Sequence, residues 1–291
     1  MQKFRGLGVA MVTPFQKNRE VDYPALSRLT EYLIQGGVDY LVVQGTTGEA
    51  ATLTQEEKQK VLDAVIDTNN HRIPIVFGHG GNNTQALINT FTQLNLSGVD
   101  AILSASPYYN KPTQSGIIAH YQALADASPV PVLLYNVPSR TASNLSAETT
   151  LTLARHTNII GIKEASANFS QISTILQYRP NDFLVISGDD ITALPTLAIG
   201  GDGLISVAGN AIPHTFSNMI RLGLNGDYTN ASVLHRKSAT LVDLLFLEGN
   251  PGGIKAALTF KGICASTLRL PLVEVSAGLH KRIAIALEGL D

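Results

Sequence analysis

Short runs of apolar residues alternate with longer amphipathic stretches along most of the chain. The runs are rich in Val, Ile and Leu at consecutive positions, which is typical of parallel strands that are buried on both faces. The pattern predicts strands within Val9–Phe15, Tyr40–Gly45, Pro74–Gly78, Ala101–Ser106, Val130–Asn136, Ile159–Lys163, Phe183–Gly188 and Gly203–Val207.

The stretches between these runs have helical periodicity, and some of them begin with recognisable caps. Asp22 followed by Pro24 predicts one helix start, and Thr54 followed by Glu56 and Glu57 predicts another. The helices named from the pattern are Tyr23–Gln35, Gln55–Asn69, Thr84–Leu96, Ser115–Ala127 and Ala147–Arg155.

Eight predicted strands, each followed by a helix, indicate an α/β protein with a (β/α)8 TIM barrel. An open doubly wound sheet has the same alternation, but it would carry a glycine-rich dinucleotide-binding turn after its first strand. The sequence there reads Gln16-Lys17-Asn18-Arg19, which favours the barrel.

The chain is longer than a barrel of about 250 residues requires. We expect residues 1–212 to form the core of the barrel. Residues 213–291 are expected to supply its last helix and a C-terminal helical extension, in one structural unit. The predicted helices of the extension are Tyr228–Glu248, Gly252–Cys264 and Val273–Glu288.

Composition narrows the class of protein. A chain of 291 residues that is 44% hydrophobic and 15% charged is expected to fold compactly, and a net charge of −2 offers no basic surface for nucleic acid. A single cysteine argues against a disulfide framework and fits a cytoplasmic location. No apolar run approaches the roughly 20 residues that span a bilayer, and Thr13-Pro14 interrupts the N-terminal run, so we expect neither a membrane span nor a secretory signal.

Lys163 is the strongest candidate for chemistry, because active sites of barrels lie at the carboxyl ends of the strands. It follows an apolar run, and the two-residue period places Lys163 and Glu164 on opposite faces of the strand. Desolvation would lower the pKa of the amine, which could then attack a carbonyl group. The alternative is a structural lysine paired with an acid from a neighbouring strand.

Neighbouring strand ends offer groups that suit such a reaction. Tyr135 could move protons during imine formation, and Arg140 could bind a carboxylate. The segment Gly45–Glu49 offers hydroxyl and backbone N–H groups to a carboxylate, although Thr46 and Glu49 also have the spacing of a capping box. A barrel-lining tyrosine and a solvated arginine are the structural alternatives.

Metal and phosphate sites are weakly supported. The histidines lack His-x-x-x-His spacing, and Asp189-Asp190 fits a helix cap better than a Mg²⁺ site. The loops after the seventh and eighth strands carry no Lys or Arg, which argues against a phosphorylated substrate. We expect no bound metal.

Five segments at the strand ends carry a recognisable pattern: Gly45–Glu49, Tyr108–Pro112, Tyr135–Arg140, Gly161–Glu164 and Ser187–Asp190. Together they resemble the pyruvate-dependent Schiff-base lyases of the N-acetylneuraminate lyase superfamily. The similarity is greatest to the family of dihydrodipicolinate synthases, also called 4-hydroxy-tetrahydrodipicolinate synthases, and it runs from Ala10 to Lys255.

The resemblance implies a lyase that condenses pyruvate with L-aspartate-4-semialdehyde, in lysine and diaminopimelate biosynthesis. It implies that Lys163 forms the imine with pyruvate and that no cofactor is needed, because the imine is the electron sink. It assigns a proton relay to Thr46, Tyr135 and Tyr109, with Tyr109 reaching in from a neighbouring subunit.

The resemblance also implies how the substrates are held. Thr47 would bind the carboxylate of pyruvate, and Arg140 would bind the carboxylate of the semialdehyde. Gly188 and Ile205 match positions whose backbone carbonyls line the site. A homotetramer, as a dimer of dimers, is the expected assembly, and surfaces buried between subunits would explain the low charge.

Two related questions stay open from the sequence. N-acetylneuraminate lyase or a 2-keto-3-deoxy sugar acid aldolase shares the lysine and the tyrosine, but Arg140 and the paired threonines favour the synthase. A non-catalytic barrel that binds a keto acid or an amino acid would not need the amine and the relay together.

The resemblance also bears on inhibition by lysine. Members of the family that lysine inhibits carry two histidines and a glutamate where this chain has Gln55, Lys58 and Ala86, although Asn82 and Tyr108 are kept. We therefore expect weak or no inhibition by lysine.

Overall fold

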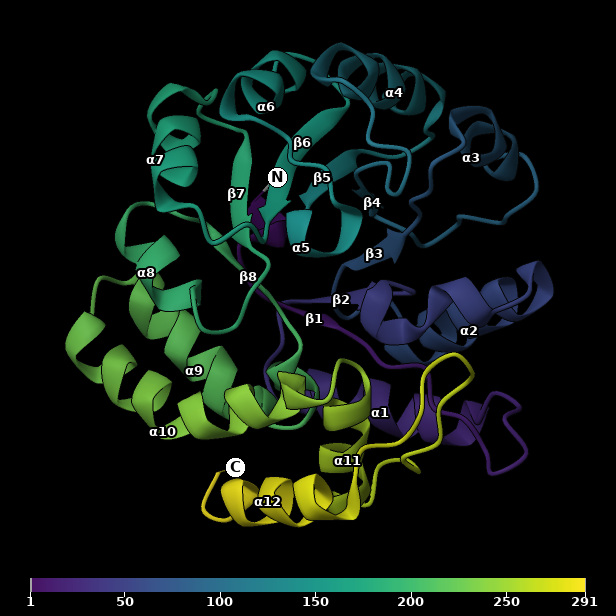
Figure 1. Ribbon diagram of the computed structural model, residues 1–291, viewed down its shortest axis with the longest axis vertical. Coiled ribbons are helices and arrows are strands. Elements are labelled where there is room, and N and C mark those ends of the chain that lie inside the picture. The colour runs from purple at the N-terminus through teal and green to yellow at the C-terminus, as the bar shows by residue number, and fades with distance from the viewer. Residues whose placement is uncertain (1, 291) are drawn as a thin grey trace.

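The computed structural model describes residues 2–290, and its centre is a closed barrel of parallel strands. Each strand pairs with the next along the chain, and β8 closes the barrel on β1 with Gly203 opposite Gly6 (Figure 1). The strands are β1 (Gly6–Ala10), β2 (Tyr40–Val43), β3 (Ile75–Gly78), β4 (Ala101–Ala105), β5 (Val132–Asn136), β6 (Ile159–Glu164), β7 (Leu184–Ser187) and β8 (Gly203–Ser206). The predicted (β/α)8 barrel is confirmed, and the open sheet is excluded.

Helices surround the barrel, as the periodicity predicted. The bounds of α1 and α2 agree with the sequence analysis, because both helices have the expected caps: Asp22 accepts from the backbone of Ala25, and Thr54 and Glu57 form a capping box. The helices of the barrel are α1 (Tyr23–Gln35), α2 (Gln55–Asn69), α3 (Thr84–Thr90), α4 (Gln114–Ala127), α6 (Ala147–Leu153), α7 (Phe169–Tyr178), α8 (Ala193–Ala198) and α9 (Pro213–Leu224). Shorter helical turns are η1 (Gln2–Phe4), η2 (Thr46–Gly48), η3 (Ala50–Thr52), α5 (Pro138–Thr141) and η4 (Ala208–Asn210).

The prediction for the first strand was wrong by several residues, since β1 ends at Ala10 and shares only its last two residues with the predicted segment Val9–Phe15. The ladder continues only as far as Met11, whose N–H donates to the carbonyl of Val42. Pro14 then has no N–H to donate. Residues 11–15 are nevertheless buried, which explains why their apolar pattern resembles that of a strand.

Three further helices form the C-terminal extension: α10 (Tyr228–Leu247), α11 (Gly252–Phe260) and α12 (Ala277–Leu287). Figure 1 shows them in green to yellow along one side of the barrel. Helix α12 begins later than the predicted Val273, because Ser276 is its N-cap and accepts from the backbone of Leu279. Within residues 2–290, no helix combines the length and the apolar character that crossing a membrane requires.

The barrel has an interior core that is distinct from the core between strands and helices. Phe4 lies in the interior core at the start of the chain, with its ring edge-on to Tyr40 at 5.7 Å between centroids.

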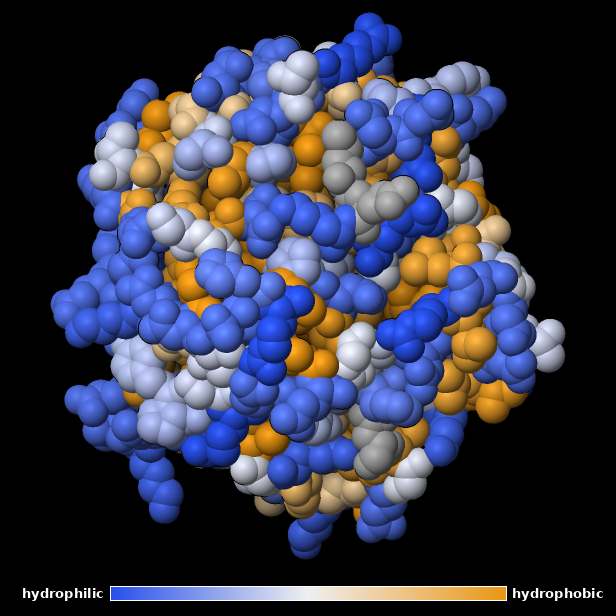
Figure 2. Space-filling view, turned by 180° about the vertical axis from the view of Figure 1, so that it is seen from behind, coloured by the Kyte–Doolittle hydropathy of each residue, from blue (hydrophilic) through white to orange (hydrophobic). Residues whose placement is uncertain are grey.

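The face opposite to that of Figure 1 mixes hydrophilic side chains with smaller hydrophobic patches (Figure 2).

A β-bulge interrupts the pairing of β5 with β6. Val132 lies opposite Ile159, but the next residue, Leu133, lies opposite Gly161, so Ile160 is an extra residue in β6. A bulge of this kind reverses the alternation of side chains beyond it. Ile160 belongs to the interior core, whereas Ile162 belongs to the outer one.

Candidate active site

A cavity of about 220 Å³ opens at the carboxyl ends of the strands. It is smaller than the roughly 300–1,000 Å³ of pockets for drug-sized ligands, so its size suits a small metabolite. Six of the eight site residues expected from the sequence line it: Thr46, Thr47, Tyr135, Arg140, Lys163 and Gly188.

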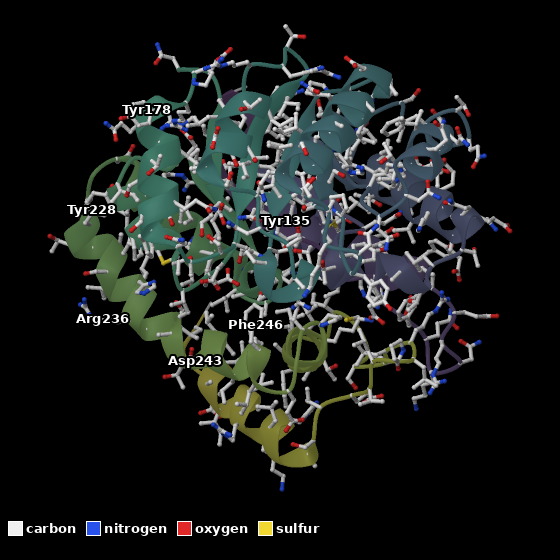
Figure 3. The ribbon with its side chains drawn as sticks, turned by 45° about the horizontal axis from the view of Figure 1, so that its top comes forward. Tyr135, Tyr178, Tyr228, Arg236, Asp243 and Phe246 are labelled. Atoms are coloured by element: carbon white, nitrogen blue, oxygen red, sulfur yellow. The ribbon has the colours of Figure 1, made fainter. Side chains whose placement is uncertain are left out.

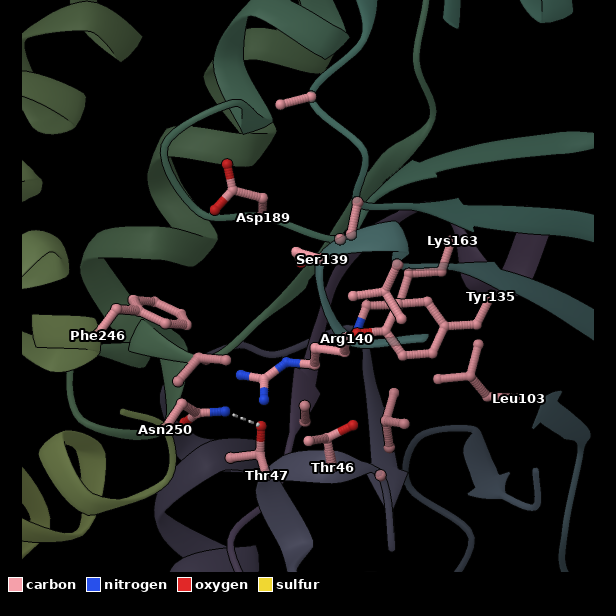
Figure 4. A pocket seen from close by; sticks show the side chains of 18 residues that line it. Thr46, Thr47, Leu103, Tyr135, Ser139, Arg140, Lys163, Asp189, Phe246 and Asn250 are labelled. Atoms are coloured by element: carbon pink, nitrogen blue, oxygen red, sulfur yellow. Dashed lines mark hydrogen bonds between the residues drawn. The ribbon is translucent and has the colours of Figure 1, made fainter. Parts of the chain in front are cut away.

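Lys163 and Tyr135 face each other inside this cavity. The two residues are direct partners in the register of β5 and β6, and the Nζ of Lys163 lies 4.1 Å from the centroid of the Tyr135 ring (Figure 4). Their side chains are buried, with Lys163 only 6% exposed. No ion pair joins Lys163 to an acid within residues 2–290, so the alternative of a paired structural lysine is wrong.

Glu164 lies on the other face of β6, as the two-residue period predicted. Its buried carboxylate accepts hydrogen bonds from the Asn136 side chain at 3.0 and 3.1 Å, from the Ser166 backbone at 2.7 Å and from the Gln171 side chain at 2.9 Å. These donors hold the end of β6 against β5 and α7. Because of the bulge, Lys163 is on the inner side of the barrel while Glu164 is in the outer layer.

The threonines lie in the turn η2, and the predicted capping box between Thr46 and Glu49 is wrong. No side chain caps this turn, and Glu49 adopts a left-handed backbone conformation with φ of 52°. Its side chain reaches Lys255 of α11 instead, with 2.5 Å between Oε1 and Nζ. The hydroxyl of Thr47 accepts a hydrogen bond from the Asn250 side chain at 3.0 Å (Figure 4).

Arg140 lies at the entrance of the cavity on α5, and its side chain is exposed. Phe246 of α10 and Asn250, both from the C-terminal extension, complete this side of the cavity (Figure 4). Figure 3 shows Tyr135 among the central elements, with Tyr178 and Tyr228 on outer helices. Phe246 and Asn250 were not predicted from the sequence, although both lie within the stretch from Ala10 to Lys255 over which the family resemblance runs.

Tyr109 and Ile205 do not line the cavity of their own chain. The side chain of Tyr109 is 87% exposed, and its backbone has a φ of 74°. Ile205 is buried in the interior core, in the same cluster as Tyr135. The contribution of Tyr109 to a neighbouring subunit and the contact of the Ile205 carbonyl therefore stay predictions.

The two adjacent aspartates have different roles. Asp189 lines the cavity and accepts from the backbone of Thr192 in the turn before α8. The predicted helix cap is wrong for it, because Thr192 is the N-cap of α8 and no side chain caps that helix. Asp190 does not cap that helix, because its buried carboxylate accepts from the Ser206 hydroxyl and from the backbones of Val207 and Ala208. Burial raises the pKa of Asp190 to about 6. Among residues 2–290, no group of three or more His, Cys, Asp or Glu side chains is arranged to hold a metal ion.

Comparisons with known proteins agree with this geometry. The profile of the Dihydrodipicolinate synthetase family matches residues 3–289. The 4-hydroxy-tetrahydrodipicolinate synthase of Flavobacterium psychrophilum is 50% identical over 284 residues, which cover 97% of each chain. The crystal structure of the chloride-inhibited dihydrodipicolinate synthase from Acinetobacter baumannii in complex with pyruvate has a TM-score of 0.95 and 39% identity, over 99% of each chain. The structure of a monomeric dihydrodipicolinate synthase variant has a TM-score of 0.96 and 36% identity, over 99% of this chain and 98% of that one. This chain belongs to the dihydrodipicolinate synthetase family.

Proposed function

We propose that the chain condenses pyruvate with L-aspartate-4-semialdehyde to give 4-hydroxy-tetrahydrodipicolinate, for lysine and diaminopimelate biosynthesis. The observation that carries the mechanism is the amine of Lys163, which is buried without an acidic partner and faces Tyr135 in a small cavity. An amine in this position can attack a keto group that is bound in the cavity.

The chemistry follows from an imine at Lys163. The amine adds to the keto carbon of pyruvate, and loss of water gives an iminium ion that withdraws electrons from the methyl group. Removal of a methyl proton yields an enamine, whose carbon attacks the aldehyde. The amino group of the second substrate then displaces Lys163 and closes the ring. Because the iminium ion is the electron sink, this mechanism requires no cofactor.

The other residues of the cavity transfer protons and bind the carboxylates of the substrates. Tyr135 lies next to the amine and moves protons during imine formation, together with Thr46. Thr47 binds the carboxylate of pyruvate. Arg140 lies at the entrance, where its guanidinium binds the carboxylate of the semialdehyde.

A homotetramer in the cytoplasm is part of the same proposal. Tyr109 supports it, since this tyrosine does not line the cavity of its own chain and is 87% exposed in the single chain. In a dimer of dimers it would complete the proton relay of a neighbouring subunit. Sedimentation of the wild type should reveal the tetramer, and Tyr109→Phe should reduce turnover without changing the fold.

Borohydride trapping tests the central step. Incubation with pyruvate followed by reduction should leave a covalent adduct on Lys163, detected by mass spectrometry of peptides. Absence of the adduct, or its persistence in Lys163→Ala, refutes the imine.

Turnover with different aldehydes tests the substrate. Aspartate semialdehyde should be consumed with pyruvate, whereas N-acetylneuraminate and keto-deoxy-gluconate should not be cleaved. Arg140→Ala should lower kcat/KM for the semialdehyde while trapping of pyruvate persists. Cleavage of either sugar acid by the wild type at a comparable rate would contradict the proposed substrate.

A further inference from the structure

Lys255 and Glu49 form an ion pair that is wholly removed from water. Their side chains are 0% exposed, and Nζ of Lys255 lies 2.5 Å from Oε1 of Glu49. Burying two charges is costly, and the attraction between them often only balances that cost. A pair of this kind is therefore weak evidence for added stability.

Further hydrogen bonds and ring contacts hold both side chains of the pair in place. Lys255 also donates to the carbonyl of Thr267 at 2.9 Å, and the second oxygen of Glu49 accepts from the backbone of Arg269 at 3.0 Å. Nζ of Lys255 and the guanidinium carbon of Arg269 lie 4.1 and 4.5 Å from the centroid of the Phe15 ring. Burial lowers the pKa of Lys255, and the facing carboxylate opposes that shift.

The pair is connected to the active site through the backbone. Glu49 directly follows η2, the turn that carries Thr46 and Thr47. Two hydrogen bonds from distant side chains also reach this turn: the Thr13 hydroxyl donates to the carbonyl of Gly48 at 2.7 Å, and Asn250 donates to the Thr47 hydroxyl. Of the three side chains Thr13, Asn250 and Lys255, the last two come from the C-terminal extension.

We propose that Lys255 and Glu49 are positioning residues for the reaction. The extension reaches over the barrel and, through this pair, holds the turn η2 so that both threonine hydroxyls point into the cavity. Neither residue lines the cavity, so each acts only through the threonines. The inference rests on the role that the proposed function gives to Thr46 and Thr47.

The test compares variants that differ in how much of the pair remains. Lys255→Met alone leaves a buried carboxylate without a partner, so the informative variant is the neutral double substitution Lys255→Met/Glu49→Gln. Glu49→Gln alone is the conservative variant, because its amide oxygen can still accept from Lys255. The buried amine can lose its charge once the carboxylate is gone, since burial lowers the pKa of Lys255. Arg179→Met is the matched control. Arg179 forms an ion pair with the mostly buried Asp202. This pair lies beside the first residues of β7 and β8, at the end of the barrel opposite to the threonines.

The expected result is a change in catalysis that loss of stability does not explain. With all variants kept well below their unfolding midpoints, the double variant should lose about tenfold or more in kcat/KM for pyruvate, since a small misplacement of reacting groups is costly. Glu49→Gln should retain most of the activity. Arg179→Met should lower the unfolding midpoint and leave kcat/KM unchanged.

A double-mutant cycle with Thr47→Val identifies the route of the effect. If the pair acts through the threonine turn, the double substitution should cost much less in the Thr47→Val background than in the wild type. An equal loss in both backgrounds, or a kcat/KM like that of the wild type, overturns the inference. If the double variant does not fold, Glu49→Asp replaces it, because the shorter side chain reaches less far toward Lys255. Its kcat/KM is then compared in the same two backgrounds. Failure of the wild type to trap pyruvate refutes the proposed function instead.

Discussion

The buried carboxylate of Glu164 should stabilise the part of the barrel that carries Lys163 and Tyr135. Its Oε1 accepts from the Asn136 side chain of β5 and from the Ser166 backbone just after β6, and its Oε2 accepts from Asn136 and from Gln171 of α7. No cation lies in an ion pair with it within residues 2–290. Replacement by Gln keeps the shape of the side chain but changes one acceptor into a donor.

The loss of stability expected for Glu164→Gln follows from the hydrogen-bond donors that surround the side chain. If the new amide oxygen serves the Ser166 backbone, the new NH₂ group faces the side-chain donors of Asn136 and Gln171. Asn136 keeps a second acceptor, Asn144 Oδ1 at 2.8 Å, whereas that atom is 3.4 Å from the Gln171 donor. A hydrogen bond to a charged group contributes about 1.5–3 kcal/mol, so we expect Glu164→Gln to lower the free energy of unfolding by about 2 kcal/mol.

Glu164→Ala should cost more, about 4 kcal/mol, because it also leaves the Ser166 N–H without its acceptor. Urea unfolding followed by circular dichroism measures both, at one protein concentration because assembly affects apparent stability. The control is Glu148→Gln, an exposed acid on α6, which should stay within about 0.5 kcal/mol of the wild type. If Glu164→Gln is as stable as this control, the carboxylate is not the acceptor on which the two strands depend.

Three further outcomes are expected. Because burial raises the pKa of Asp190 from 3.8 to about 6, the folded state binds the extra proton, so stability should fall by about 3 kcal/mol as the pH rises from about 4 to about 6. Asp190→Asn should remove this part of the pH dependence in urea titrations, and an unchanged slope would contradict the assignment. Gly161→Ala should cost about 1–3 kcal/mol and reduce imine trapping, since its Cβ would lie 2.7 Å from Leu184 atoms. The control Gly278→Ala on α12 should not destabilise the protein, because its Cβ would meet only Ser276 Oγ, at 3.9 Å. Lysine at low-millimolar concentration should leave initial rates almost unchanged, because Lys58 repels an incoming ammonium group; clear inhibition would refute this.

Local patterns were sufficient for the order of elements and, except for β1, for the approximate ends of the strands. Eight apolar runs separated by helical segments predicted the barrel, and the bounds of α1 and α2 followed from their caps. Lys163 was found in the same way, as a lysine at the end of an apolar run. These features depend on residues that are close in sequence, where periodicity and capping preferences act.

Which side chains meet in the cavity was decided by contacts between distant residues. The bulge at Ile160 is set by pairing with β5, and it determines that Lys163 lies inside the barrel. The turn at Thr47 is held by Asn250, 203 positions away, and Glu49 is held by Lys255, 206 positions away. The local spacing suggested a capping box between Thr46 and Glu49, because no residue near Glu49 in the sequence indicates the buried amine that it contacts. Only the folded chain brings that partner within reach, since the cost of burying each charge is offset only when both arrive together.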